Sequence, residues 1–413
     1  VVKEKGQTVV DIPVAPLVEA SPEYDRPYYE IGAPTTIRAE NVPAETSIPA
    51  ALETLMASPD LCSRRWIWEQ YDHMVMTGTV IEPGSDAAVV RLRLEGKEKL
   101  IAIANDCNNR YCWLDPYAGG KIAIAECLRN LACSGARPLG MTNNLNFGNP
   151  NKPESYYMLK EAIHGLAEAC KFFDIPVVGG NVSLYNENVD SKIDPTPVVS
   201  IAGIIDDAAH ITTQYAKGAG NSLILLGGAP NELGGSYYLK VMHDLKTGAV
   251  PAIDLEKEKA LGDFLRAQIA AGAVKAAHDL SEGGLLCAVA EMCFTPGKTF
   301  GAKVDVSELF DANGVAAPSG VGGNAPSMPE GATLVSVLYG ESTARALIEV
   351  PAEQAESVLA AAQEAGVPAS LIGEVSDATE LEVSLGADSD TLRWSTADLR
   401  AAWETSIEKV MAR

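Results

Sequence analysis

Hydrophobic and polar residues alternate in two distinct rhythms between about residue 61 and residue 208. Short apolar runs typical of strands occupy residues 87–92, 100–104, 175–178 and 197–205. Apolar positions recur every three or four residues at 121–133 and 154–173, which is the spacing of an amphipathic helix. The pattern predicts a domain in which strands and helices alternate.

A second domain is predicted from about residue 219 onward. Its first strand, 222–226, is apolar and ends at a glycine pair. Helical spacing follows at 255–271, 283–293, 352–365 and 396–411, and a strand pattern at 333–338. Residues 312–331 are rich in Gly and Pro, which predicts a flexible loop or insertion outside the core.

Seven prolines lie between Pro13 and Pro49, within the first 60 residues. Proline removes backbone donors and interrupts long helices, so we expect an extended linker that lies along another domain; a disordered arm is the alternative. The expected organisation is a linker at 1–60, a first domain at 61–210 and a second domain at 211–413. Because the chain opens without Met in a polar stretch, we expect a piece of a longer protein.

Charge and cysteine content narrow the functional classes. The 413 residues carry 32 basic and 55 acidic side chains, and this formal charge of −23 argues against a nucleic-acid partner. A single ATP is compatible with it, since ATP needs only a local site with Mg²⁺ and backbone N–H groups. No apolar run reaches the length of a membrane span, and no signal peptide is recognisable. Eight cysteines without a C-x-x-C pair indicate the reducing cytoplasm.

The strongest local motif lies at 177–186, where an apolar strand leads into Gly179 and Gly180 and then into polar residues. Glycine lets the backbone approach a phosphate closely because no Cβ intervenes. Asn181 offers a neutral oxygen that suits Mg²⁺, and Ser183 can donate to a phosphate or sugar oxygen. A glycine turn stabilised by the asparagine is the alternative interpretation.

Two further polar clusters lie in the first domain. Residues 142–150 are too amide-rich for a core strand; they suit the mixed edges of a nucleotide, or they form an Asx turn before the next helix. Asp106 and Asp115 could hold a cation, although Asp115 is equally well placed to cap a helix.

The second domain has a glycine-rich turn at 232–236 and a cluster at 278–284. His278 could be a ligand or a base, or it could be structural, and Ser281 is a plausible N-cap for the following helix. The sequence contains no P-loop, no zinc-type spacing of Cys and His, no H-E-x-x-H and no Gly-x-Ser-x-Gly. If the chain binds ATP, it does so without a Walker motif.

Together these segments resemble the formylglycinamide ribonucleotide amidotransferase family, in the second half of that enzyme. The matching segments, in the family's order, are 70–72, 79–80, 83–89, 106–111, 119–123, 130–136, 145–150, 179–187, 232–236, 278–284 and 338–342. The motif Leu145-Asn146-Phe147-Gly148-Asn149-Pro150 also separates this family from its fold relatives. The resemblance covers nearly the whole chain from about residue 61.

The resemblance implies an α+β domain followed by an α/β domain, both like those of aminoimidazole ribonucleotide synthetase. It implies ATP-dependent conversion of formylglycinamide ribonucleotide to the amidine, with ATP and Mg²⁺ as cofactors. The amide oxygen would be phosphorylated, and ammonia would then displace the phosphate. Because no glutaminase-like region follows Arg413, we expect the small type, which works with a separate glutaminase subunit and a small bridging subunit.

The resemblance also implies roles for individual residues. By position, Asn143 and Gly180 would contact ATP, Asn181 would ligate Mg²⁺, and Ser183 would contact the substrate. The family often has Asp where this chain has Asn143, which removes a charge. The family's catalytic histidines and acidic metal ligands lie in its first half, so we expect no catalytic residue here and no activity without that half.

Two rival interpretations assign the chain to different functional classes, one an enzyme and the other a scaffold. One is another ATP-dependent synthetase of the same superfold, acting on aminoimidazole ribonucleotide, selenophosphate or thiamin phosphate. The other is a non-catalytic scaffold half that holds a structural nucleotide.

Overall fold

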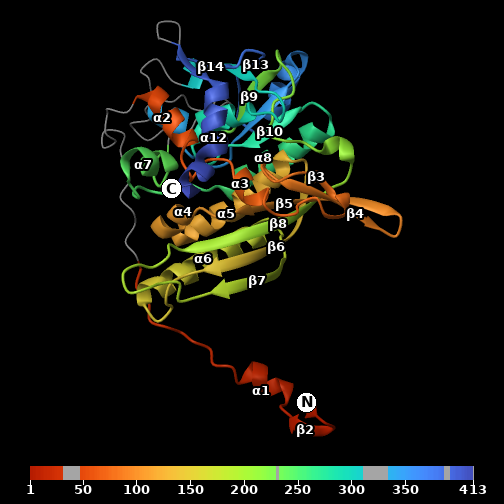
Figure 1. Cartoon of the computed structure of the whole chain (residues 1–413), viewed down its shortest axis with the longest axis vertical. Helices are drawn as coiled ribbons and strands as arrows, with labels where there is room; N and C mark the ends of the chain where they lie inside the picture. Colours follow the sequence, from red (N-terminus) through yellow and green to blue (C-terminus); the bar gives the residue numbers. More distant parts are fainter. Residues whose placement is uncertain (31–46, 229–231, 310–333, 386–390, 413) are drawn as a thin grey trace.

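The chain forms two α/β bodies, each built on one large sheet, with an extended N-terminal arm (Figure 1). The computed structural model describes residues 1–30, 47–228, 232–309, 334–385 and 391–412. The arm contains a hairpin of β1 (Val2–Glu4) and β2 (Gln7–Val10) followed by α1 (Val14–Glu19). None of the helices in these described residues is long and apolar enough to cross a membrane.

The first body is a six-stranded sheet with the order β3-β4-β5-β8-β6-β7. The strands are β3 (Thr79–Ile81), β4 (Ala88–Leu94), β5 (Lys97–Asp106), β6 (Arg137–Asn146), β7 (Val177–Ser183) and β8 (Thr196–Ile205). All neighbours are antiparallel except β6 and β7, which run parallel. Parallel neighbours need a crossover, and α6 supplies it.

The helices of the first body lie on one face of this sheet (Figure 1). They are α4 (Asn109–Leu114), α5 (Pro116–Cys133) and α6 (Pro153–Phe172). Every second residue of β8 is buried, as expected when one face of a strand packs on helices. Helices α5 and α6 pack closely at Gly165, where a Cβ would lie 2.0 Å from the Tyr117 carbonyl oxygen.

The second body is a seven-stranded sheet with the order β10-β12-β9-β13-β11-β14-β15. Its strands are β9 (Ser222–Leu226), β10 (Ala276–Asp279), β11 (Gly301–Asp305), β12 (Ala346–Val350), β13 (Ala369–Ser376), β14 (Glu380–Ser384) and β15 (Leu392–Ser395). Only β11 and β14 pair in parallel among these described strands.

Two separate apolar layers enclose this sheet. One contains α8 (Leu255–Ala270) and α11 (Ala355–Glu364). The other contains α2 (Ile48–Met56), α7 (Tyr237–His243), α9 (Gly284–Met292), α10 (Leu334–Tyr339) and α12 (Thr396–Met411). A short helix, α3 (Arg65–Trp68), contacts α12.

The prediction of an extended linker is wrong for its last part, because residues 48–56 form helix α2. The Ser47 side chain caps the helix, and proline in a first turn costs no intrahelical hydrogen bond. Leu52 and Leu55 are fully buried in the core of the second body. Three side chains hold the surrounding backbone: Tyr339 Oη donates to Ile48 O (2.7 Å), Trp394 Nε1 to Pro49 O (3.1 Å) and Trp403 Nε1 to Leu61 O (3.1 Å).

Most predicted helices and strands are confirmed within one turn, but two are wrong. Residues 142–146 continue strand β6, with their amides alternating between the two faces of the sheet, and the Asx turn occurs only at Asn149, whose Oδ1 accepts from Asn151 N at 2.9 Å. Residues 334–339 form helix α10, although their apolar run predicts a strand. The predicted loop at 312–331 lies outside the described residues.

Candidate functional site

The four residues predicted to contact ATP, Mg²⁺ and substrate lie on β6 and β7. Because these strands are parallel, their carboxyl ends meet at one edge of the sheet. The register pairs Asn143 with Gly180 and Asn146 with Ser183. Sequence positions nearly forty residues apart therefore become immediate neighbours.

Asn143 and Gly180 lie on the same side of the sheet. Asn143 pairs with the buried Val199 of β8, which places its side chain on the helix-covered face. A Cβ at position 180 would lie 2.4 Å from Asn143 Oδ1 and 2.9 Å from its carbonyl oxygen. The contact therefore leaves room only for glycine, and the exposed backbone at 180 is open to a ligand.

Asn181 lies on the opposite face, which carries no helix among the described residues. Its Nδ2 donates to Asn144 Oδ1 at 2.9 Å, and both residues are exposed. No hydrogen bond to the Asn181 amide oxygen occurs among the described residues. That oxygen is the kind of neutral, hard ligand that suits Mg²⁺.

Ser183 is half-buried at the end of β7. Its hydroxyl donates to Asn186 Oδ1 at 3.2 Å, and Asn186 Nδ2 in turn donates to Phe147 O at 3.1 Å. These bonds fold the loop back against the end of β6 and fix the serine at the edge of the sheet.

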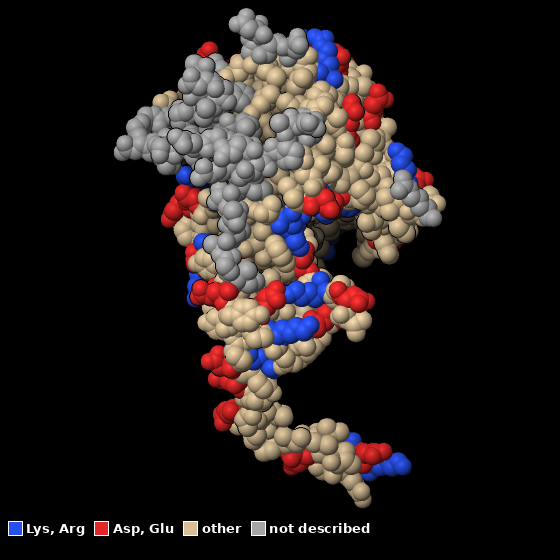
Figure 2. Space-filling model, turned by 90° about the vertical axis from the view of Figure 1, so that its left-hand side faces the viewer, with Lys and Arg blue, Asp and Glu red and all other residues tan. Residues whose placement is uncertain are grey.

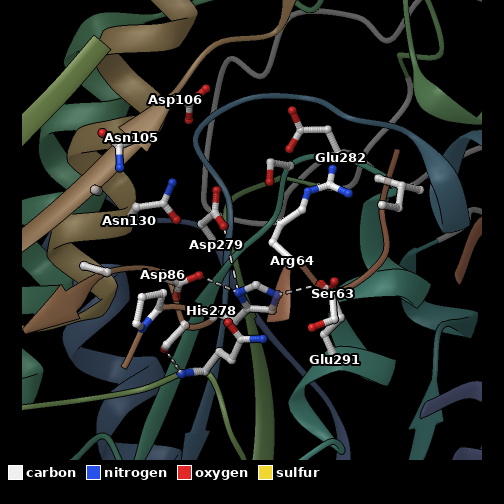
Figure 3. A pocket seen from close by; sticks show the side chains of 18 of the residues that line it. Ser63, Arg64, Asp86, Asn105, Asp106, Asn130, His278, Asp279, Glu282 and Glu291 are labelled. Carbon is white, nitrogen blue, oxygen red and sulfur yellow. Dashed lines mark hydrogen bonds and ion pairs between the residues drawn. The ribbon is translucent and has the colours of Figure 1, made fainter. Parts of the chain in front are cut away.

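A second site lies between the two bodies, in a cleft of about 760 Å³ that we call the interdomain cleft (Figure 3). Its polar lining includes Ser63, Arg64, Asp86, Asn105, Asp106, Asn130, His278, Asp279, Glu282 and Glu291. Asp86, Asn105, Asp106 and Asn130 belong to the first body, and His278, Asp279, Glu282 and Glu291 belong to the second. Ser63 and Arg64 precede the first body. Carboxylates therefore converge on the cleft from both bodies.

His278 is held between two carboxylates (Figure 3). Its Nδ1 lies 2.7 Å from Asp86 Oδ1, and its Nε2 lies 3.0 Å from Glu291 Oε2. Burial alone would lower the histidine pKa, but the two carboxylates raise it well above its ordinary value. Burial raises the pKa of Asp86 to about 6, against the opposing effect of His278. The imidazole is thus a cationic link between the two bodies.

Arg129 of α5 forms the second ionic link. Its guanidinium lies 2.6 Å from Glu258, 3.5 Å from Asp279 and 3.4 Å from Glu126. All four side chains are buried. One arginine cannot neutralise every acid nearby: burial and neighbouring carboxylates raise the pKa values of Asp106 and Glu126 well above their ordinary range.

The carboxylates of the interdomain cleft could hold a cation, whereas protonated His278 could not, because both of its ring nitrogens already face carboxylates. Ligand atoms of Asp86, His278 and Asp279 lie within 4.8 Å of one another. Asp86 Oδ2 is buried and has no hydrogen-bond partner among the described residues. Carboxylate oxygens suit Mg²⁺, whereas the histidine nitrogen is more typical of transition metals.

The structure separates several residues that the sequence groups together. Asp106 lines the interdomain cleft, whereas Asp115 accepts from Ala118 N at 3.0 Å and caps α5. Ser281 is not the N-cap of α9; Gly283 takes that position in a left-handed conformation with φ +82°.

Apart from Asp106, sequence reasoning missed the acidic residues at the cleft. A usable signal was present in α5, where Glu126 and Arg129 interrupt an otherwise apolar helix face. Charged groups are seldom fully buried unless they are paired, so this pattern points to an internal ionic network. No comparable signal marks Asp86, because its partner His278 is far away in sequence.

Comparison with known proteins places this geometry in a family. The model of the AIR synthase related N-terminal domain matches residues 84–205, and that of the AIR synthase related C-terminal domain matches residues 218–386. The chain belongs to the AIR synthase related family. The predicted fold, an α+β domain followed by an α/β domain of this family, is confirmed.

Within this family, the chain is similar to phosphoribosylformylglycinamidine synthase subunit PurL of Brucella ovis and Brucella suis. Each is 41% identical over 401 residues, which is 97% of this chain and 50% of the relative. The chain thus spans about half the length of the curated relatives it matches, and the predicted resemblance to this synthase is confirmed.

Two solved structures show the same fold. T. maritima PurL complexed with FGAR matches with a TM-score of 0.65 and 19% identity, over 86% of this chain and 53% of that chain. A HypE–HypF complex matches with a TM-score of 0.55 and 17% identity, over 79% of this chain and 97% of that chain.

Proposed function

We propose that this chain is the C-terminal half of a small-type formylglycinamide ribonucleotide amidotransferase, a cytoplasmic enzyme of purine biosynthesis. The whole enzyme would amidate formylglycinamide ribonucleotide at the expense of ATP. The observation that carries the proposal is the 41% identity to PurL subunits along 97% of the chain. T. maritima PurL has been solved with FGAR, ADP and ATP.

The β6–β7 edge would contribute part of the reaction site. Gly180 lets a nucleotide approach the strand, and Asn143 beside it offers an amide to the nucleotide. Asn181 would supply one oxygen to Mg²⁺, which stabilises the transferring phosphoryl group when bound. Ser183 would position the substrate from the same edge. The catalytic groups would come from the other half.

The exposed edge of the six-stranded sheet supports a partner domain. Edge strand β7 exposes Val177, Val178 and Val182, which are 55%, 72% and 55% accessible. Such a long edge strand invites pairing or cover. We propose that the first half's N-terminal domain packs there, and that a separate glutaminase and a small bridging subunit complete the assembly. A complex named PurLQS has been solved from Thermotoga maritima.

Reconstitution tests the proposal. The chain and the remaining half of the same protein are expressed separately, mixed, and assayed for ADP release with formylglycinamide ribonucleotide, ammonia and Mg-ATP. Neither half alone should turn over, and the mixture should. Asn181→Ala should lower the rate of the mixture by about 100-fold, the scale of losing one preorganised electrostatic contact. Gln363→Ala, at an exposed amide on α11, is the control.

The assignment would be overturned if the mixture did not turn over formylglycinamide ribonucleotide but did turn over the substrate of another AIR synthase related enzyme. An Asn181→Ala mixture as fast as the control would remove only the metal role of Asn181.

The interdomain cleft favours a second candidate function: a scaffold half that holds a nucleotide and its cations without catalysing the reaction. The observation behind it is the excess of buried carboxylates, with Asp86 Oδ2 unpartnered among the described residues. Calorimetry of the isolated chain with Mg-ATP distinguishes the two. Two results together would favour the scaffold. The isolated chain would bind Mg-ATP and lose this binding in the Asp106→Asn variant, and the Asn181→Ala mixture would keep its full activity.

A further inference from the structure

The N-terminal arm is folded, but its hairpin and helix are exposed to solvent. Residues 2–19 form hairpin β1–β2 and helix α1, and every described side chain from 1 to 20 is exposed. Figures 1 and 2 show the arm projecting away from the two bodies in both views. A two-stranded hairpin and a six-residue helix are not stable alone in water, so this element needs a partner.

The arm presents an apolar surface suited to burial. Val14, Leu17 and Val18 of α1 follow the i, i+3, i+4 spacing of one helix face and are 73%, 60% and 70% accessible. In the hairpin, Val2 pairs with Val10, so two valines lie side by side on one face.

The root of the arm is anchored to the first body. Tyr28 stacks on Tyr157 of α6 with ring centroids 6.3 Å apart, and the Lys160 ammonium lies 4.0 Å from the centre of the Tyr28 ring. Tyr156 Oη donates to Tyr24 O at 3.4 Å. The anchored segment thus begins only a few residues after the end of α1.

The chain contains a second copy of this arrangement in which the partner is visible. At the end of the second body, hairpin β14–β15 is followed directly by helix α12. There β14 pairs with β11, β15 forms the edge of the seven-stranded sheet, and Leu399 of α12 is buried. The arm has the same succession of antiparallel hairpin and helix, but its apolar stripe is open.

We infer that residues 2–18 complete the sheet of another AIR synthase related C-terminal domain, carried by the remaining half of the protein. Strand β1 would take the place that β14 has here, β2 would form the outer edge, and the apolar stripe of α1 would cover the sheet as α12 does. The inference rests on the proposed function, under which the relatives, twice the length of this chain, have room for that domain. Strand addition gives affinity through main-chain hydrogen bonds, and side-chain pockets give specificity.

The test uses the full chain and the separately expressed remaining half. Titration calorimetry is run on the wild type, on Leu17→Asp and on Ala15→Asp. Leu17→Asp should weaken association by about thirtyfold or more, the loss expected for one fully buried leucine. Ala15→Asp adds the same charge to α1 outside the stripe and should bind like the wild type.

Amide hydrogen exchange gives a second, directional readout. On complex formation, amides of β1 should exchange at least about tenfold more slowly, as in a strand that gains a pairing partner. Amides of β2 that point away from β1 should change little, because β2 stays at the edge.

The outcomes separate this inference from the proposed function. If wild type and Leu17→Asp bind equally and both reconstitute turnover, the arm is not a docking element but the enzyme assignment stands. If the wild type does not bind the other half at all, both the inference on the arm and the proposed function are wrong. Equal weakening by Leu17→Asp and Ala15→Asp would also overturn the inference, because the stripe would then not be what is buried.

Discussion

At the scale of the residue, Gly180 is the position with the sharpest steric requirement in the β6–β7 edge. Gly180→Ala forces a Cβ to within 2.4 Å of Asn143 Oδ1 and 2.9 Å of the Asn143 carbonyl oxygen. We expect the free energy of unfolding to fall by about 1–3 kcal/mol, the usual cost of overpacking. Urea denaturation of the isolated chain measures it.

Gly179→Ala is the matched control for that substitution. A Cβ there would meet only Thr142 Cγ2, at 3.9 Å. Gly180→Ala should therefore lower the free energy of unfolding clearly more than Gly179→Ala does. Equal free energies for the two variants would show that β7 does not hold the described register against β6.

A buried carboxyl predicts a pH dependence of stability. Glu341 accepts hydrogen bonds from Gly283 N and Tyr237 N and from Tyr111 Oη at 2.5 Å, yet burial raises its pKa to about 7. Between pH 5 and 8 the folded state holds this proton more tightly than the unfolded state, so stability falls as pH rises. Glu341→Gln should remove this dependence, and its stability relative to wild type should improve by about 2–3 kcal/mol from pH 5 to pH 8.

Chemical denaturation at several pH values checks this prediction. Because the wild type and the variant share all other titrating groups, the difference between the two curves isolates Glu341. Parallel curves across this range would contradict the raised pKa.

Individual residues show how far sequence reasoning reaches. The alternative roles of Asp106 and Asp115 remained open in the sequence, and only the fold shows that one lines the cleft and the other caps a helix. His278 stands at the end of a strand, as its motif suggests, and Glu291 comes from the next helix, but its other partner, Asp86, comes from the first body. Such contacts depend on how the two bodies pack, which no local pattern encodes.

At the scale of the element, α2 ties the region before the first body into the core of the second. Leu55→Ala should lower the free energy of unfolding by about 2–5 kcal/mol, because Leu55 is fully buried and the cavity would remain. Glu53→Ala, on the exposed side of the same helix, should change it by less than about 0.5 kcal/mol. Thermal or urea unfolding checks both, and similar values for the two variants would mean that α2 is not packed as described.

Elements with regular spacing of apolar residues were predictable from the sequence, whereas elements whose conformation depends on packing against the rest of the chain were not. Helix α6 has twenty residues of regular spacing and begins at a proline, so its limits follow from the sequence. Helix α10 is only six residues long, and a short apolar run does not distinguish a buried helix from a strand. Helix α2 was hidden by the high proline content around it, although Ser47 and Pro49 are favourable helix-start residues.

At the scale of the whole molecule, Arg129 joins the two bodies through a buried network with Glu258 and Asp279. Arg129→Met would leave these carboxylates buried without their cation, so we expect a loss of about 3–5 kcal/mol. Lys259→Met, which removes an exposed pair with Asp263, should cost less than about 1 kcal/mol. Calorimetric unfolding is the measurement, and a small loss for Arg129→Met would mean that the bodies are held together by other contacts.

The two-body organisation was predictable because each body has its own run of strands and helices. Their mutual arrangement was not, since it depends on side chains such as Arg110, which donates from one body to carbonyl oxygens of Gly235 and Leu245 in the other. The family resemblance supplied the fold class without this detail. The exact domain limits and the roles of Asn143, Gly180, Asn181 and Ser183 stay predictions.

The indole ring of Trp394 donates to the carbonyl oxygen of Pro49 in the first turn of α2, and that of Trp403 donates to the carbonyl oxygen of Leu61 beyond the end of α2. These two rings therefore form a built-in optical reporter. If the segment before the first body peels away, both indoles lose a hydrogen bond and gain water, and their emission shifts to the red. In a variant whose Trp66, Trp68 and Trp113 are replaced by Phe, fluorescence can thus report how this segment packs on the second body.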